Sequence, residues 1–398
     1  MAQVIFRKGL DMKEAVASEL SAAYHSQIVD EVRANDYRLE SGRLTLFLAR
    51  EFGFCYGVDR AVDYAYQTRR KFPDKRVFLT GEIIHNPHVN DRLRSQGIRF
   101  LSDPDASWDD IRPEDVVILP AFGVSIADML RLEGYGCTLV DTTCGSVLNV
   151  WKNVRRYAQD GFTSVIHGKV HHEETRATAS QATQFPNGHF LIVRDEAEAG
   201  LVCEFIRRGG DGAALAAHFG EAVSPGFDPD QHLGYIGCAN QTTMLMSESL
   251  RIGDMLKAAM RDRHGEASLA DRFRAFDTIC SATQERQDAV TALLDERALD
   301  LMVVIGGYNS SNTCNLARIC AERVPTYHIA EPDCLVSATD IRHRPIGQPS
   351  TAGVPETVTS GWLPAEGRLA VGLTAGASTP NNLVGQVIER LRALALNA

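Results

Sequence analysis

The sequence predicts an α/β fold built from three successive rounds of parallel βα units. Each round has a segment that ends at a cysteine and is followed by a stretch with helical periodicity. Further apolar runs in each round end in polar loops. Strands that alternate with helices form parallel sheets, and ligands bind at the carboxyl ends of such strands. The loops are therefore expected to face one shared site. The three cysteines are Cys55, Cys144 and Cys280.

Short apolar runs mark the expected strands, and apolar residues at every third or fourth position mark the helices between them. The helix after Cys144, for example, carries Val147, Trp151, Val154 and Ala158 on one face. The repeat is one of organisation rather than of letters. The expected strands span 44–48, 76–80, 116–119, 138–140, 163–166, 233–236, 301–305 and 369–373.

The pattern also predicts how the chain is divided. Two mixed, polar stretches at 11–25 and 27–37 have helical character and precede the first round. Residues 206–232 are rich in Gly and Asp, and residues 339–366 are rich in Pro, Gly and Thr, so both are expected to be insertions or long loops. The expected parts are an N-terminal extension over 1–42 and three α/β lobes over 43–143, 144–279 and 280–398.

Composition excludes several classes of protein. The chain has 398 residues, of which 44% are hydrophobic and 23% are charged, as in an ordinary globular protein. Its net charge of −10 disfavours nucleic acid or an anionic membrane as the main partner. No apolar run is long enough for a membrane span. Nine cysteines without dense spacing favour a reducing cytoplasm over a secreted disulfide framework.

Cys55, Cys144 and Cys280 lie too far apart in sequence to form a local metal knuckle. Each is expected at a helix start, where partial positive charge and unpaired N–H groups lower a thiol pKa. If the three thiolates meet, they can hold a soft metal or an iron–sulfur cluster with one open position. Zinc and coincidence are the alternatives. The other cysteines are expected to be small apolar fillers: Cys137, Cys203, Cys238, Cys314, Cys320 and Cys334.

A compact group of titratable side chains follows the strand expected at 163–166. An imidazole beside a carboxylic acid suits proton delivery, although surface polarity is an equally simple interpretation. Side chains alternate in an extended segment, so one histidine and one glutamate of 171–174 should point inward. On this argument His171 and Glu173 share a side, opposite His172 and Glu174.

Two loops rich in small and hydroxyl residues, 309–312 and 375–378, lead into expected helices. A serine there can simply be an N-cap. Hydroxyls, amides and helix N-terminal N–H groups also form phosphate sites, and His85 and Asn86 can add donors. The chain has neither a P-loop nor a GxGxxG motif, so a nucleotide is not implied.

Taken together, the motifs resemble those of the LytB (IspH) family of 4-hydroxy-3-methylbut-2-enyl diphosphate reductases. The resemblance runs from about residue 44 to about residue 391, most of the chain. No single motif is decisive, but the ordered set is highly specific. The matching stretches are 53–61, 82–87, 141–144, 171–175, 240–243, 277–287, 309–312 and 374–378.

The resemblance implies a fold, a cofactor and roles for residues. The fold would be a three-lobed, pseudo-threefold trefoil of small, mostly parallel sheets flanked by helices around a central iron–sulfur site. The cofactor would be a 4Fe–4S cluster held by Cys55, Cys144 and Cys280, with one iron left open. By motif, the catalytic acid falls on Glu173, with Thr242 as its hydroxyl partner. The implied diphosphate ligands are His85, His171, Ser310, Ser311, Asn312 and Ser378.

One residue departs from the family pattern. Many bacterial members have a histidine where this chain has Phe122, so its diphosphate site is expected to have one imidazole fewer. This difference, the N-terminal extension and the long insertions are similar to the plant and cyanobacterial branch of the family.

The implied reaction removes an allylic hydroxyl reductively, with two electrons and two protons. It would convert (E)-4-hydroxy-3-methylbut-2-enyl diphosphate to isopentenyl and dimethylallyl diphosphates, the last step of the methylerythritol phosphate route, with a donor such as ferredoxin or flavodoxin. Two alternatives stay open. One is another three-cysteine cluster enzyme that resembles quinolinate synthase, which needs no diphosphate site. The other is a non-enzymatic iron–sulfur sensor or a zinc protein, whose zinc a fourth ligand would usually close.

Overall fold

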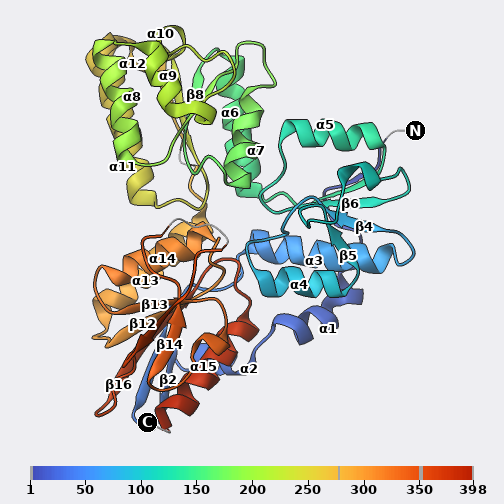
Figure 1. The fold of residues 1–398 in the computed structure, drawn as a ribbon, viewed down its shortest axis with the longest axis vertical. Helices are drawn as coiled ribbons and strands as arrows, with labels where there is room; N and C mark the ends of the chain where they lie inside the picture. The colour runs from blue at the N-terminus through green and yellow to red at the C-terminus, as the bar shows by residue number, and fades with distance from the viewer. Residues whose placement is uncertain (1–2, 277, 349–352, 397–398) are drawn as a thin grey trace. The chain divides into compact units, whose positions relative to one another are not determined.

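The computed structural model describes residues 3–276, 278–348 and 353–396 (Figure 1). The chain forms two compact units. Unit 1 comprises Met1–Ile5, Asp109–Glu114 and Leu119–Cys280, and unit 2 comprises Phe6–Trp108, Asp115–Ile118 and Ser281–Ala398. Both contain small, mostly parallel sheets with helices packed on them, so the predicted α/β class is confirmed. Within the described residues, no helix combines the length and apolarity needed to cross a bilayer.

Unit 1 is built on a four-stranded sheet in the order β11-β10-β8-β9, in which every described pairing is parallel. Its core includes apolar side chains from α6, α7, α8 and α11. The α8 and α11 helices pack against each other, as do α6 and α7. The elements are α5 (Ile126–Tyr135), β7 (Thr138–Asp141), α6 (Gly145–Gln159), β8 (Thr163–His167), α7 (Glu173–Ala182), β9 (Phe190–Val193), α8 (Glu196–Arg208), α9 (Gly212–Phe219), η2 (Gly220–Ala222), α10 (Pro229–His232), β10 (Ile236–Asn240), α11 (Met246–His264), α12 (Glu266–Arg272) and β11 (Phe273–Ala275).

Unit 2 contains a five-stranded sheet in the order β13-β12-β16-β3-β2, parallel except for β2. In the same unit, β4 pairs in parallel with β5 and β6, and β14 and β15 form an antiparallel pair. The elements are α1 (Lys13–Tyr24), α2 (Gln27–Ala34), β2 (Arg38–Ser41), β3 (Leu44–Leu48), α3 (Tyr56–Lys71), β4 (Val77–Leu79), α4 (Pro87–Ser95), β5 (Ile98–Phe100), α13 (Ser281–Glu296), β12 (Leu301–Ile305), α14 (Ser311–Ala321), β13 (Thr326–Ile329), η3 (Pro332–Cys334), β14 (Asp340–His343), β15 (Thr357–Ser360), β16 (Leu369–Ala375) and α15 (Asn381–Leu396). Three short elements lie across the division between the units: β1 (Ile5–Phe6), η1 (Trp108–Asp110) and β6 (Val116–Leu119).

Strand β12 shows why this five-stranded sheet lies deep in the unit. All five of its residues are buried, and successive side chains enter two different hydrophobic clusters. Leu301, Val303 and Ile305 join the cluster that includes residues of α2 and α15. Met302 and Val304 join the cluster that includes residues of α13 and α14. A parallel strand covered on both faces is a continuous apolar run, which is the pattern that the sequence shows.

One strand belongs to a different sheet from the one its place in the sequence suggests. The run 44–48 forms β3, but β3 pairs with β16 and β2 and therefore lies in the sheet of the expected third lobe. The two helices expected in the N-terminal extension are present as α1 and α2, and α2 packs on α15. The lobe boundaries stay a prediction, but residue 43 does not mark a division between sheets.

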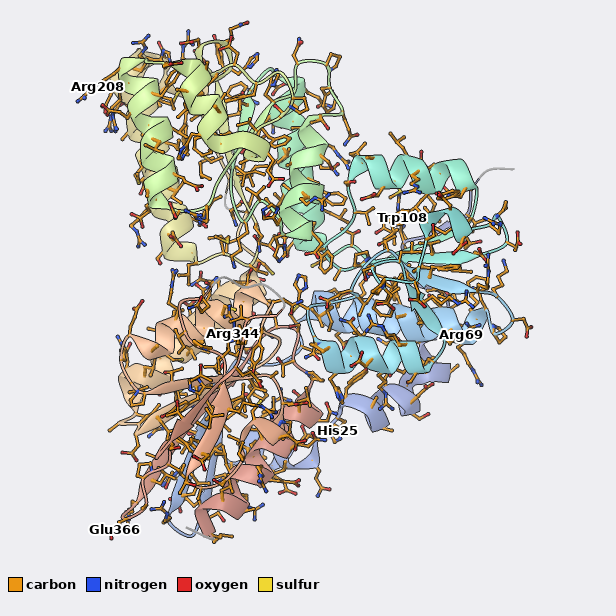
Figure 2. All side chains as sticks on the ribbon, viewed as in Figure 1. His25, Arg69, Trp108, Arg208, Arg344 and Glu366 are labelled. Carbon is orange, nitrogen blue, oxygen red and sulfur yellow. The ribbon has the colours of Figure 1, made fainter. Side chains whose placement is uncertain are left out.

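The two expected long loops contain regular structure. Residues 206–232 include α9, η2 and α10. The N-cap of α9 is Asp211 and that of α10 is Asp228, and each side chain accepts a backbone N–H. The Gly and Asp residues that suggested a loop therefore end and start helices. Residues 339–366 contain the β14–β15 pair, although residues 349–352 lie outside the described part. In this region Arg344 is almost fully buried and donates to the Gln348 carbonyl and to the Cys314 sulfur (Figure 2).

A close packing contact inside unit 1 gives the first prediction. A Cβ atom on Gly237 of β10 would lie 2.6 Å from ring atoms of Tyr157 in α6. Gly237→Ala should therefore lower the free energy of unfolding by about 1–3 kcal/mol, because the buried ring has to shift. Gly253→Ala in α11 is the matched control, since nothing lies within 4 Å of its added methyl group. It should be neutral or stabilising by about 0.5–1 kcal/mol. Denaturant unfolding measures both, and equal midpoints for the two variants would contradict the packing.

Candidate active site

The three predicted cysteines all lie immediately before a helix. Cys55 is the N-cap of α3 and Cys144 is the N-cap of α6, both with extended backbone, and α13 begins directly after Cys280. This confirms the predicted strand-to-helix setting. Of the cysteines predicted to be fillers, Cys137, Cys203, Cys320 and Cys334 are buried, whereas Cys238 and Cys314 are only partly buried.

Unit 1 brings two of these thiols together. The Ser146 hydroxyl lies 3.3 Å from Cys280 Sγ, and the same residue also bonds to the Cys144 sulfur. Burial raises the pKa of Cys144, and the nearby Cys280 adds to the rise, although bonds from the first amides of α6 oppose it. At Cys144 the expected lowering of the thiol pKa by the helix start is therefore outweighed by burial. Two thiols that lie this close can both bind one soft metal ion, which displaces their protons when it binds.

A carboxylic acid reaches the same part of unit 1. Strand β10 ends at Asn240, and the loop after it carries Thr242. The Thr242 N–H donates to Glu174 Oε1 at 2.5 Å, and the Thr242 carbonyl accepts from the Cys280 N–H at 3.4 Å. Glu174 is therefore connected to the Cys280 backbone through one residue. This contact uses the Thr242 backbone and Glu174, so the predicted pairing of the Thr242 hydroxyl with Glu173 stays a prediction.

The structure corrects the prediction for residues 171–174. The backbone is not extended there, because His172 is the N-cap of α7 and the helix starts at Glu173. His172 and Glu174 are buried, whereas His171 and Glu173 are exposed. His171 is 83% exposed and lies 3.3 Å from Glu221, a surface contact. The argument that put His171 and Glu173 on one side of an extended strand is therefore wrong, since it used a period of two at the start of a helix. The assignment of Glu173 as the acid, which came from the family resemblance, stays a prediction, and its carboxylate lies within 4.8 Å of a ring nitrogen of His172.

The orientation of His172 is fixed from two sides. Its Nδ1 atom accepts the Glu174 N–H at 3.2 Å, so neutral His172 carries its proton on Nε2. The ring of Phe122, which is also buried, packs edge-on against the imidazole with centroids 6.4 Å apart. Phe122 thus contacts a histidine of the site rather than supplying an imidazole itself.

Unit 2 holds a cluster of neutral hydrogen-bond donors at the start of α14. Ser310 is the N-cap and accepts the Thr313 N–H, and Ser311 and Asn312 form the first turn. All three are buried. Asn312 Oδ1 accepts the Ala377 N–H at 2.9 Å, while within the described residues Asn312 Nδ2 is buried without a hydrogen-bond partner. A buried donor without a partner at a helix N-terminus is suited to an anion.

Two further predicted residues lie beside this cluster. The Ser378 hydroxyl donates to the His85 carbonyl at 3.1 Å, and Asn86 Nδ2 donates to the Ser378 carbonyl at 2.8 Å. His85 Nδ1 lies 2.8 Å from Glu82 Oε2, which also accepts from Asn309 Nδ2 at 2.8 Å. Glu82 therefore orients the His85 ring, a role that the sequence reasoning missed.

The Cys55 loop lies next to the same donors within unit 2. The Cys55 N–H donates to the Ala377 carbonyl at 3.1 Å, one residue before Ser378. Arg286 of α13, whose side chain is buried, donates to the Gly53 carbonyl at 2.8 and 3.2 Å and to the Phe54 carbonyl at 3.3 Å. The thiol is thus placed by a buried cation from the helix after Cys280. Arg286 falls in a motif that the sequence analysis noted, but nothing in the sequence indicated its partner.

The fold and the site define an α/β protein in which helix starts carry thiols, a buried acid and a group of buried hydrogen-bond donors. The model of the LytB protein family matches residues 46–392, and the chain belongs to this family. The 4-hydroxy-3-methylbut-2-enyl diphosphate reductase of Gloeobacter violaceus is 49% identical over 97% of this chain and 91% of its own length. The same enzyme of Thermosynechococcus vestitus is 47% identical over 98% of this chain and 94% of its own length. Both organisms agree with the predicted cyanobacterial branch.

Two solved structures that match this chain support the same assignment of its fold. A structure described as (E)-4-hydroxy-3-methyl-but-2-enyl diphosphate reductase, the terminal enzyme of the non-mevalonate pathway, is 27% identical and has a TM-score of 0.50. The match covers 87% of this chain and 99% of that one. The E-1-hydroxy-2-methyl-but-2-enyl-4-diphosphate reductase of Plasmodium falciparum is 20% identical with a TM-score of 0.61 over 86% of both chains, and shows the shared fold.

The geometry of the α14 cluster predicts binding of inorganic pyrophosphate. Pyrophosphate should raise the melting temperature of the wild-type chain in a concentration-dependent manner. Asn312→Asp keeps the oxygen that accepts from Ala377 but replaces the buried donor with a negative charge. Its affinity should fall at least about tenfold, or about 1.4 kcal/mol. Asn187→Asp, at an exposed position, is the control for the added charge and should bind normally. Equal pyrophosphate affinity in all three proteins would remove Asn312 from the anion site.

Proposed function

We propose that this chain reduces (E)-4-hydroxy-3-methylbut-2-enyl diphosphate to isopentenyl and dimethylallyl diphosphates, the last step of the methylerythritol phosphate pathway. The observation that carries the proposal is the group of side chains in unit 1: two thiols, a buried carboxylic acid and a threonine within a few hydrogen bonds of one another. The reductases named above, which match nearly the whole chain, support the choice of substrate.

The cofactor that fits these residues is a 4Fe–4S cluster held by Cys55, Cys144 and Cys280. Sulfur ligands select such clusters, and the adjacent Cys144 and Cys280 supply two of them from one unit. Three cysteine ligands leave one iron without a protein ligand. When bound, the cluster supplies single electrons and a Lewis acid at that iron.

The proposed proton donor is Glu173, as the family resemblance implies, and its carboxylate lies within 4.8 Å of a ring nitrogen of His172. The neighbouring Glu174 is buried and accepts the Thr242 N–H, so it positions the start of α7 against the loop after β10. In the reaction the Glu173 proton passes to the leaving hydroxyl oxygen, which departs as water. His172, whose Nε2 carries the proton of the neutral ring, can donate a hydrogen bond to the substrate. In this proposal His172 takes the place that the sequence analysis gave to His171.

The diphosphate end of the substrate is assigned to unit 2. Ser310, Ser311, Asn312 and Ser378 offer neutral donors, and His85 offers an imidazole oriented by Glu82. The N-terminus of α14 adds a partial positive charge. Binding energy from this remote group orients the short carbon chain and so lowers the barrier at the reacting carbon. The two electrons come from a carrier such as ferredoxin or flavodoxin, used twice in each turnover.

The test is anaerobic reconstitution with iron and sulfide, followed by turnover of the hydroxylated diphosphate with dithionite-reduced viologen. Wild-type protein should be brown and should form both products. Cys55→Ser, Cys144→Ser and Cys280→Ser should each lose chromophore and activity, while Cys203→Ser, a buried thiol of α8, should keep both. Full iron content in one of the three variants would remove that cysteine from the ligands. An iron-loaded wild-type protein that binds no pyrophosphate and reduces nothing would favour a sensor or another cluster enzyme.

The proposed acid gives a paired prediction. Glu173→Gln keeps the shape of the side chain but removes its acidic proton, so kcat should fall by roughly two to four orders of magnitude. Glu174→Gln should lower kcat far less, because its carboxamide oxygen can still accept the Thr242 N–H. Steady-state turnover and iron content of both variants measure this, and iron content should stay normal. An inactive Glu174→Gln beside an active Glu173→Gln would assign the proton donor to Glu174 instead.

A further inference from the structure

We propose that the exposed face of α6 is the docking surface for an acidic, one-electron carrier protein. The proposal rests on the function proposed above, because it identifies where electrons enter the same site. Helix α6 starts directly after Cys144, and the Leu148 N–H bonds to the Cys144 carbonyl at 3.0 Å. The first exposed turn of α6 is therefore one helical turn from a proposed cluster ligand.

The charge of α6 distinguishes it from the other two helices that start beside the cysteines. Helix α3 carries Asp59 and Asp63 beside Arg60 in its first half, and its other three basic residues lie in the last turn, away from Cys55. Helix α13 carries four acidic residues and one basic one. Helix α6 has the sequence GSVLNVWKNVRRYAQ, with no acidic residue and three basic ones. An acidic carrier is repelled at long range by a chain of net charge −10 unless a local basic surface attracts it. Among the three helices that start beside the thiols, α6 alone has no carboxylate to oppose its cations, so it is the best suited to attract such a partner.

The side chains of α6 divide into a buried face and an exposed face. Val147, Val150 and Val154 are among the residues that face the core of unit 1. The exposed face carries Leu148, which is 45% exposed. Lys152 follows one helical turn later, and Arg156 one turn after that. An apolar side chain followed by cations matches the anatomy of a protein interface, with an apolar contact and a charged rim.

Neighbouring charges leave this face basic. Arg155 points its guanidinium at Gln181 of α7, at 2.6 and 2.8 Å, and keeps its positive charge. Asp160, the C-cap of α6, forms an ion pair with Arg274. Glu173 and Arg176, both exposed at the start of α7, carry opposite charges. Together these groups bring no net negative charge to the side of the helix that carries Lys152 and Arg156.

A second exposed apolar side chain, Phe276, packs against a residue of α6. It is 44% exposed and stacks on Tyr157, with ring centroids 6.1 Å apart and planes at 26°. It precedes Cys280 by four residues. Exposed aromatic side chains are enriched at protein interfaces, and this one lies in the segment that leads to a second proposed ligand.

The chemistry of the reaction requires a transient contact. Reduction takes two electrons and two protons, breaks the carbon–oxygen bond and releases water, so two reduced carriers become oxidised in each turnover. An oxidised carrier must leave before the next one binds. Electron-transfer encounters accordingly use small interfaces, in which opposite charges steer association. A short basic helix face with one apolar residue fits this need better than a deep groove.

The experiment compares two electron donors. The double variant Lys152→Glu and Arg156→Glu should have a kcat/KM for a reduced plant-type 2Fe–2S ferredoxin that is about ten- to a hundredfold lower at low salt. Electrostatic steering of association contributes factors of this size. Turnover with reduced methyl viologen, which needs no docking, should stay within about twofold. The control is the double variant Arg208→Glu and Arg263→Glu, which changes the net charge equally. Both residues are exposed, on α8 and α11 respectively, and Arg208 is labelled in Figure 2. This control should leave both rates unchanged.

Binding of oxidised ferredoxin, followed by calorimetry, supplies a readout independent of turnover. The wild-type affinity should be higher at about 0.01 M than at about 0.15 M salt, where charges are screened within about 8 Å. The α6 variant should lose most of this difference, and Lys152→Gln/Arg156→Gln should lose part of it. A ferredoxin affinity that the α6 variants do not change, or that the control lowers equally, would overturn the docking proposal. A wild-type protein that binds ferredoxin but does not reduce the substrate with viologen would overturn the proposed function instead.

Discussion

The parallel pairing of β8 with β10 is the constraint on which the site in unit 1 depends. Its register sets Ile236–Asn240 opposite Thr163–His167, so the two strands end side by side. The Gln241 N–H continues the pairing to the His167 carbonyl at 2.8 Å. The loop after β10 therefore begins where the loop that leads to α7 begins. A slip of one residue would turn every side chain of the strand to the opposite face, and the contact between Thr242 and Glu174 would be lost.

A layer of buried polar side chains holds these two loops together. Gln241 Oε1 accepts the Lys169 N–H at 3.2 Å and the Thr175 hydroxyl at 3.1 Å, and its amide donates to Thr243. Asn240 bonds to the Thr278 hydroxyl, two residues before Cys280. Buried polar groups destabilise a fold unless they are paired, so a network of this kind accepts few alternative arrangements. It links the position of the acid to that of the Cys280 segment. Arg286 has the corresponding role in unit 2, where it fixes the Cys55 loop.

The sequence predicted best what depends on local periodicity. The strands at 44–48, 116–119 and 301–305 and the helix starts after the cysteines have the expected bounds, because burial on both faces and helical spacing leave clear patterns. The sheet to which β3 belongs was not predictable in this way, since its pairing with β16 joins residues more than 300 positions apart. The inward face of 171–174 was missed for a different reason. Histidine is not a favoured N-cap, so nothing marked His172 as the residue at which the period changes from two to 3.6.

The proposed anion site would let a chain of net negative charge bind a diphosphate without a cluster of basic side chains. The residues assigned to it in unit 2 are three serines, an asparagine and a histidine, and the helix dipole of α14 supplies further positive potential. Neutral donors at buried positions give little long-range attraction, but they impose direction because each hydrogen bond must be satisfied. In the docking proposal, the long-range attraction comes from the cations of α6, a helix without a carboxylate. The two proposed sites would then not compete for the same charges, because directional bonds select the small anion while basic side chains of another helix steer the acidic protein.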